Sequence, residues 1–270
     1  MKMRKRINRF GILVLLTLMI LGGVEASGET SGYRWYCVHA KDHIQPRADE
    51  SFSFVEKLGG YYIDHRHTSV EDPDKVVYLT FDAGYENGNV AKVLDVLQEH
   101  DVTGAFFILG HLIDSKPELI QRMVTEGHTV CNHTVRHKDM SCATNEELLS
   151  ELHELESKFE VLTGERMASY YRPPEGSFSR RNLECAYENG YKTVFWSFAY
   201  PDWDNSRQMP AEKAKKIILE NLHNGEVMLL HPTSSVNAEI LGDVIREIKA
   251  QGYRFGTLEE LTKNELARTE

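Results

Sequence analysis

Short β-rich runs alternate with amphipathic helical stretches from Val76 onward, and this alternation limits the possible folds more than any other feature. The expected strands are 76–81, 104–109, 129–132, 170–172, 193–197, 227–231 and 253–255. The expected helices between them are 89–99, 117–126, 145–162, 180–189, 211–223 and 238–251. Such alternation is typical of βα units around a parallel sheet. Because seven strands occur without a GxGxxG loop, we predict an α/β fold with a closed or nearly closed (β/α)7 barrel.

The first 26 residues differ in kind from the rest of the chain. Five basic residues precede a 15-residue apolar run, 10–24, and a small residue follows at Ala26. A basic start, a short apolar core and small residues at the end form a secretory signal, so we predict a signal peptide over 1–26. The alternative is an uncleaved membrane anchor, since the run is only a little shorter than a spanning helix. Either way, the rest of the chain is expected outside the cytoplasm.

The remainder divides into three parts by pattern. Residues 27–74 are rich in Tyr, His and Asp and show weak periodicity, so we expect an irregular N-terminal extension that lies over the core. The barrel domain is expected over 75–262, and a short C-terminal tail over 263–270.

The charge of the chain limits its partners. Cleavage after residue 26 would remove five basic residues and one acid, which takes the net charge from −10 to −14. An acidic surface argues against nucleic acid and against polyanions bound by charge. A neutral glycan is compatible with it.

Four cysteines, at positions 37, 131, 142 and 185, form no CxxC pair and no zinc-ribbon spacing. Export permits disulfides, but a core of this size does not need them for stability. We therefore expect buried free thiols.

Polar residues follow five of the expected strands, at the end where the chain leaves each strand. They are Asp82, His133, Arg172, Asp202 and His231. In βα barrels, catalytic groups gather where strands end and βα loops begin. Chance placement would scatter such residues over both ends, so we expect these five to share one rim.

Each of these signals also has an ordinary structural interpretation. An aspartate such as Asp82, followed by a glycine, often caps a turn or helix. His133 and His137, four residues apart, can bind one metal ion if they share a helical turn, or can be two surface histidines. His231 closes an apolar strand and could be a hydrogen-bonded core residue.

Two loops add further candidates. The segment 172–176 ends a strand with Arg172, and its two prolines and glycine hold a loop that can present a free backbone N–H, although an ordinary turn has the same composition. Asp202 and Trp203 pair a carboxylate with a large aromatic ring, a combination used where a sugar ring stacks and a second residue must be oriented.

Taken in order, the five segments resemble the five motifs of the polysaccharide deacetylases, the NodB-homology domain of carbohydrate esterase family 4. The resemblance covers about 75–262 and implies a distorted (β/α)7 barrel of the NodB-homology type. Within the family, the chain most resembles the delta-lactam-biosynthetic de-N-acetylases of spore-forming bacteria. That closer likeness rests on residues 80–89, on 195–197 leading to 202–203, and on 59–62.

The closer resemblance implies a substrate and a location. The substrate is N-acetylmuramic acid in peptidoglycan glycan strands, and the freed amine later closes onto the lactyl carboxyl as the delta-lactam of the spore cortex. The expected location is the cell wall or spore cortex, with the membrane involved only through an uncleaved N-terminal segment. The oligomeric state is left open.

The resemblance also implies a role for each acid–base residue. Asp82 matches the general base, and Arg172 matches the residue that tethers this base and keeps it ionised. His231 matches the general acid that protonates the leaving amine, and Asp202 matches the residue that orients it.

Other positions match the metal and substrate contacts of the family. His133 and His137 match the metal ligands, and the backbone N–H of Glu175 matches an oxyanion donor. Leu229 matches a wall of the acetyl-methyl pocket and Trp203 a wall of the groove.

At Ala83 the sequence departs from the family, most of which has a second aspartate there as third metal ligand. Catalytic zinc usually holds three protein ligands, so two imidazoles are expected to bind a divalent ion, zinc by preference, more weakly. Asp139 or Glu86 could complete the site, water could fill the place, or the enzyme could act with little metal. The lactam-forming branch is known to depart from aspartate here, so Ala83 favours that branch.

Two other functions fit the same motifs. One is a de-N-acetylase of GlcNAc in peptidoglycan or a chitin-like polymer, or an O-acetyl esterase. The other is a non-catalytic glycan-binding protein. The presence of Asp82, Arg172, Asp202 and His231 argues against a binding protein, which needs neither a base nor its tether.

Overall fold

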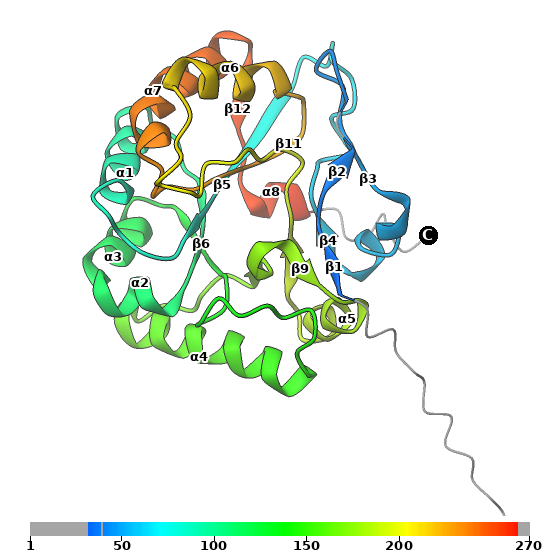
Figure 1. Ribbon diagram of the computed structural model, residues 1–270, viewed down its shortest axis with the longest axis vertical. Helices are drawn as coiled ribbons and strands as arrows, with labels where there is room; N and C mark the ends of the chain where they lie inside the picture. The colour runs from blue at the N-terminus through cyan, green and yellow to red at the C-terminus, as the bar shows by residue number, and fades with distance from the viewer. Residues whose placement is uncertain (1–31, 39, 264–270) are drawn as a thin grey trace, which may run out of the picture.

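Residues 32–38 and 40–263 are described by the structure, a computed structural model (Figure 1). The predicted signal segment 1–26 and residues 264–270 of the predicted tail lie outside the described residues. Within the described ranges, no helix combines the length and the apolar character needed to cross a membrane.

A curled sheet of parallel strands forms the centre of the protein. Its order is β11 (Glu226–Leu230), β5 (Lys75–Ala83), β6 (Ala105–Ile108), β7 (Thr129–Asn132), β8 (Tyr170–Tyr171), β10 (Lys192–Val194) and β4 (Gly60–Tyr61), and β12 (Tyr253–Phe255) pairs with the start of β5. All these pairings are parallel. The seven predicted strands are present, although the predicted strand 193–197 ends at Val194.

The two edges of this sheet meet and close it into a distorted barrel. Isolated bridges join Ile63 to Glu226 and Phe198 to Met228. The Ser197 N–H also donates to the Val227 carbonyl at 3.0 Å. The two edges are therefore joined by isolated bridges and not by a continuous strand pairing, in agreement with the predicted distorted barrel.

Helices cover the outside of the sheet. They are α1 (Val90–Glu99), α2 (Gly110–Ser115), α3 (Pro117–Thr125), α4 (Asn145–Thr163), α5 (Arg180–Glu188), α6 (Ala211–Asn221) and α7 (Ser235–Ala250). Figure 1 shows α6 and α7 at the top and upper left, α1–α3 on the left and α4 at the bottom, with the N-terminal strands on the right. The six predicted helices are present, but α7 begins three residues early because the Ser234 side chain accepts from the Asn237 N–H and caps it.

Side chains of β5 alternate between two apolar layers, as the period of two in a strand requires. Val77, Leu79 and Phe81 pack between the sheet and the helices. Val76 and Tyr78 pack inside the barrel, where Leu258 and Leu261 of a further short helix, α8 (Leu258–Thr262), join the same cluster. The inner face then continues with Thr80 and Asp82, so polar groups follow the apolar core along one strand.

The N-terminal extension is mostly irregular, as predicted, but several short segments of it form strands and 3-10 turns. β4 belongs to the main sheet, and β1 (Tyr33–Arg34) pairs antiparallel with β9 (Ser177–Phe178). β2 (Cys37–Val38) pairs with β3 (Arg47–Ala48), and two 3-10 turns, Glu50–Phe52 and Glu56–Leu58, follow. Strands of two residues carry no periodicity, because their pairing depends on partners far away in the sequence.

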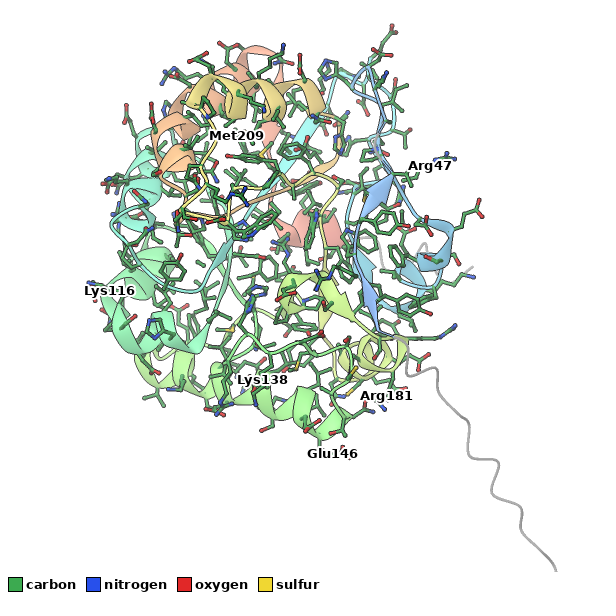
Figure 2. All side chains as sticks on the ribbon, viewed as in Figure 1. Arg47, Lys116, Lys138, Glu146, Arg181 and Met209 are labelled. Carbon is green, nitrogen blue, oxygen red and sulfur yellow. The ribbon has the colours of Figure 1, made fainter. Side chains whose placement is uncertain are left out.

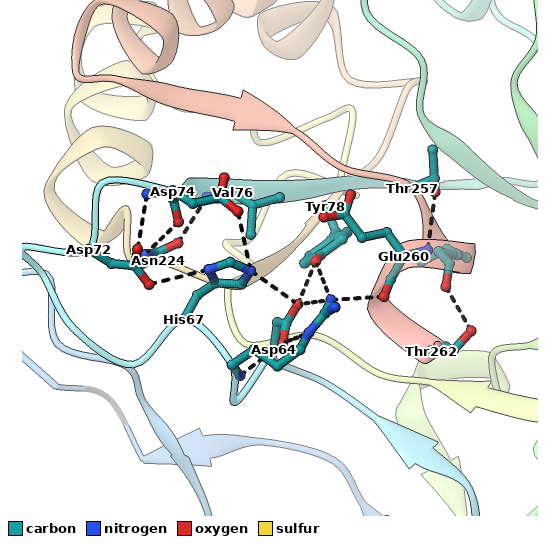
Figure 3. A network of polar contacts seen from close by, with 12 residues as sticks. Asp64, His67, Asp72, Asp74, Val76, Tyr78, Asn224, Thr257, Glu260 and Thr262 are labelled. Atoms are coloured by element: carbon teal, nitrogen blue, oxygen red, sulfur yellow. Dashed lines mark hydrogen bonds and ion pairs between the residues drawn. The ribbon is translucent and has the colours of Figure 1, made fainter. Parts of the chain in front are cut away.

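A polar network fixes the extension to the barrel at the amino ends of the strands (Figure 3). The buried Asp64 carboxylate accepts from the Tyr78 hydroxyl at 2.5 Å and from the guanidinium of Arg66. His67 Nδ1 lies 3.4 Å from an oxygen of Asp72, and Asn224 Oδ1 accepts from the backbone of β5.

All four cysteines are free thiols, as predicted. Cys131 and Cys185 are buried and Cys37 is half-buried, but Cys142 is exposed, so the prediction of burial is wrong there. Charged side chains such as Arg47, Lys116 and Glu146 lie at the periphery (Figure 2).

Candidate active site

A cavity of about 740 Å³ opens at the carboxyl ends of the barrel strands. Seven of the predicted site residues line it: Asp82, His133, His137, Glu175, Trp203, Leu229 and His231. The other two lie behind this wall, where Arg172 contacts Asp82 and Asp202 contacts His231. The residues meet because the carboxyl ends of parallel strands share one edge.

Arg172 is completely buried and holds Asp82 in place. Its Nη1 donates to Asp82 Oδ1 at 2.8 Å, its Nη2 to Thr80 Oγ1 at 2.9 Å, and its Nε to the Val194 carbonyl at 2.8 Å. The guanidinium also lies over the Phe107 ring, 4.1 Å from the ring centroid. The other donors of the guanidinium bind neutral oxygens, so Asp82 is the one carboxylate to which the Arg172 guanidinium is hydrogen-bonded.

Asp82 is an ionised carboxylate at the cavity wall, with a side chain that is 10% exposed. Burial alone raises the pKa of Asp82. The charge of Arg172 is the largest of the opposing effects, which together outweigh burial and hold this pKa below its ordinary value. The carboxylate is therefore able to accept a proton at neutral pH.

His133 and His137 lie in a loop, so the predicted helical turn is wrong. Thr134 and His137 have left-handed backbones, with φ of 70° and 56°. The Thr134 N–H donates to Asn132 Oδ1 at 2.9 Å, and the His137 N–H donates to Thr134 Oγ1 at 3.0 Å. This tight loop brings the two rings to 5.0 Å between centroids. The i, i+4 spacing therefore correctly predicted that the two rings lie close together, but they do so through a loop and not through a helical turn.

The two imidazoles fit a pair of metal ligands. His133 Nδ1 lies 2.8 Å from the Arg172 carbonyl, which can only accept, so Nδ1 carries the proton and Nε2 keeps its lone pair. Burial lowers the pKa of His133 to about 4, so the ring is neutral at pH 7, as a metal ligand must be.

Within the described part of the chain, no third ligand accompanies these two histidines. Ala83 is buried among apolar side chains between the sheet and the helices. Glu86 and Asp139, the predicted substitutes, are not among the residues that line the cavity. Among residues 32–38 and 40–263, no three or more His, Cys, Asp or Glu side chains form a group that could hold a metal ion.

His231 and Asp202 form the second acid–base pair of the site. Asp202 Oδ1 lies 2.7 Å from His231 Nδ1, and Asp202 Oδ2 accepts from the backbone N–H of His231 at 2.7 Å. Asn237 Nδ2 donates to the same Oδ2 at 2.6 Å. Burial lowers the pKa of His231, but the hydrogen bond and charge of Asp202 outweigh it and raise this pKa above its ordinary value.

Glu175 lies in the loop that the two prolines stiffen. Its backbone is left-handed, with φ of 55°, between Pro174 and Gly176. A non-glycine residue in this region is strained and persists only where its surroundings hold it. The side chain accepts from Arg34 at 2.8 Å.

Sequence reasoning missed several residues of this site. Thr80 could have been found, because it is two residues before Asp82 and so lies on the same face of the strand. Arg34 and Trp35 of the extension also line the cavity, but Arg34 contacts a residue 141 positions away, and no local pattern signals that contact.

Known proteins resemble this chain over most of its length. A family model described as polysaccharide deacetylase matches residues 69–194. Peptidoglycan-N-acetylmuramic acid deacetylase PdaA of Bacillus subtilis is 37% identical over 247 residues, which cover 90% of this chain and 92% of PdaA. A peptidoglycan-N-acetylglucosamine deacetylase of Bacillus cereus is 30% identical over 72% of this chain and 91% of its own. The solved structure of PdaA, described as a family 4 carbohydrate esterase, matches with a TM-score of 0.81 over 87% of this chain and 99% of that one.

Proposed function

The chain belongs to the polysaccharide deacetylases of carbohydrate esterase family 4, and on that premise we propose that it removes the N-acetyl group from N-acetylmuramic acid in peptidoglycan. One observation carries the proposal: an ionised Asp82 tethered by Arg172 shares a cavity with a His231 held by Asp202. The similarity to a muramic acid deacetylase over nine tenths of the chain supports the choice of sugar.

Asp82 is the general base in this proposal. Its carboxylate accepts a proton from the water that attacks the acetyl carbonyl, and Arg172 keeps it ionised and correctly oriented. A positioned base contributes about 10²–10⁴-fold to the rate.

The substrate is held against three parts of the wall. The backbone N–H of Glu175 donates to the oxygen that becomes negative in the tetrahedral intermediate, and one such donor contributes about 10²–10³-fold. Leu229 contacts the acetyl methyl group. Trp203, which is 61% exposed at the cavity rim, offers a ring face to the sugar.

Metal dependence is a property of the deacetylases of this family. In this chain, His133 and His137 would hold the ion, through nitrogen atoms that suit Zn²⁺. When bound, a divalent ion lowers the pKa of water and polarises the acetyl carbonyl.

His231 completes the reaction as general acid. Its Nδ1 is held by Asp202, so Nε2 is the nitrogen that gives its proton to the leaving amine. The freed amine can then close on the lactyl carboxyl to form the delta-lactam of the spore cortex. The basic and apolar N-terminal segment supports export to the cell wall, where such strands lie.

Product analysis tests the proposed substrate. The protein is incubated with peptide-stripped glycan strands, released acetate is assayed, and mass spectrometry locates the free amine. We expect free amines on muramic acid. Deacetylated glucosamine beside intact muramic acid would assign the alternative substrate, and binding without acetate release would assign a glycan-binding protein.

The pH profile of an Asp202→Asn variant tests the general acid. Without the carboxylate of Asp202, burial is the largest remaining influence on His231 and outweighs the nearby charge of Asp82, so the pKa of His231 falls. Only the protonated ring donates, so activity is lost as pH rises through this pKa. We expect the basic limb of kcat/KM to move to lower pH, with a loss of about 10²-fold at pH 8.

Asp204→Asn is the matched control, because the Asp204 carboxylate in the same loop only caps a turn at Ser206. It should keep the wild-type profile. A basic limb that stays in place in Asp202→Asn would contradict the role of His231.

Zinc binding measured by calorimetry without substrate tests the metal ligands. We expect His137→Ala to weaken binding by at least about tenfold, since even residues behind the ligands contribute that much. His153→Ala, at an exposed position of α4, is the control. Equal affinities of wild type and His137→Ala would contradict this site.

A further inference from the structure

The extension places one arginine at the cavity beside the Glu175 loop. β1 pairs with β9 so that Arg34 lies opposite Ser177, and the Trp35 N–H donates to the Gly176 carbonyl at 2.9 Å. A Cβ atom on Gly176, where φ is 65°, would lie 3.1 Å from the Trp35 Cβ. The close approach of the two backbones therefore depends on glycine and fixes where the Arg34 side chain begins.

Trp35 anchors this strand. Its ring is buried and stacks on Phe195 at 4.4 Å between centroids, and its Nε1 donates to the Trp196 carbonyl at 2.8 Å. Arg34 is thus exposed on a rigid base rather than on a freely moving chain, and less entropy is lost when its guanidinium binds a ligand.

Arg34 is the only lysine or arginine among the described residues that line the cavity. Its side chain is 71% exposed, and among the described residues it makes one ion pair, from Nη2 to Glu175 Oε2 at 2.8 Å. A guanidinium has five N–H donors, so several are left for another acceptor. By contrast, the Arg172 guanidinium is buried and its nitrogens are already bonded to Asp82, Thr80 and backbone carbonyls.

We propose that Arg34 binds the carboxylate of the 3-O-lactyl group and thereby selects N-acetylmuramic acid over N-acetylglucosamine, an inference that rests on the proposed function. The lactyl ether is on the ring carbon next to the one that bears the acetamido group. A residue that binds the lactyl group must therefore lie beside the acetyl site. Arg34 meets this condition because it contacts the side chain of Glu175, and the backbone N–H of Glu175 faces the acetyl oxygen in the proposed mechanism.

Charge supports the same assignment. The chain has a net charge of −10, and the cavity wall also contains the carboxylates of Asp82 and Glu175, so an anionic substrate is repelled unless a cation receives it. A guanidinium binds a carboxylate through two parallel hydrogen bonds, which glucosamine, with a hydroxyl at this position, cannot offer. In the absence of substrate, the Glu175 carboxylate keeps the Arg34 guanidinium in position through their ion pair.

The test compares two forms of one substrate. Peptide-stripped strands with free lactyl carboxylates are assayed beside the same strands after conversion of these carboxyls to methylamides. On free carboxylates, we expect Arg34→Gln to lower kcat/KM by about tenfold to a hundredfold, mainly through KM, as for a lost hydrogen bond to a charged group. On methylamides, we expect wild type and Arg34→Gln to agree within about threefold.

Two further variants sharpen the comparison. Arg47→Gln makes the same charge change on β3 of the same extension, at an exposed position outside the cavity wall (Figure 2), and should behave as wild type on both substrates. Arg34→Lys keeps the positive charge but cannot donate two parallel hydrogen bonds to a carboxylate. On free carboxylates its activity should therefore lie between those of Arg34→Gln and wild type.

Equal losses on both substrates would overturn the inference, because they would show that Arg34 only stabilises the β1–β9 pairing. Unchanged kcat/KM on free carboxylates would overturn it as well. If the wild-type protein releases acetate only from glucosamine, the proposed substrate fails instead, and this result is distinguishable because it does not involve the variants.

Discussion

Asp82→Asn is expected to lower kcat by about 10²–10⁴-fold with little change in KM. An amide has nearly the shape of a carboxylate but cannot accept the proton of the attacking water. The substrate contacts assigned to Glu175, Leu229 and Trp203 are unaffected, so the loss should appear in the chemical step. Acetate release from peptide-stripped strands at saturating substrate measures it.

Asp95→Asn provides the control, because Asp95 is a carboxylate on α1 that pairs with Arg122 on the outside of the barrel. It should retain wild-type kcat. If Asp82→Asn kept more than about a tenth of wild-type kcat, Asp82 would not be the general base, since a positioned base contributes at least about 10²-fold.

Arg172→Met is expected to lower the free energy of unfolding by about 3–5 kcal/mol. The variant leaves the Asp82 carboxylate largely buried without its counter-charge, and it removes the donors to Thr80 Oγ1 and to the Val194 carbonyl. Methionine fills part of the space over Phe107, so lost packing is the smaller component. Urea unfolding at pH 7 measures the change.

The double variant Asp82→Asn/Arg172→Met separates charge from packing. Removing both charges of a buried pair costs less than removing one, so the double variant should be more stable than Arg172→Met alone. Its activity should still be lost. A double variant less stable than Arg172→Met would show that the ion pair does not explain the effect.

The strands of the barrel could be predicted because each carries its own signal. β5, β6, β7 and β11 are almost wholly buried, and strands buried on both faces are continuous apolar runs. α4 is equally local, since Thr144 and Glu147 form a capping box and Gly164 ends the helix.

The extension shows where such reasoning stops. β4 has two residues and joins the sheet only through β10, more than a hundred residues later. In the His133–His137 loop, two left-handed residues replace the helical turn that an i, i+4 spacing suggests. Short segments of this kind are stabilised by tertiary contacts, which override weak local preferences.

The sequence by itself determined the seven strands of the barrel and the rim on which five polar residues meet, because buried strands and βα order are local properties of the chain. Only the tertiary structure decided that His133 and His137 approach through a loop, that Ala83 faces the helices, and that Arg34 from the extension enters the cavity wall. The physical reason is that these features depend on contacts between segments far apart in the chain, and local sequence patterns do not indicate which distant segments will be in contact.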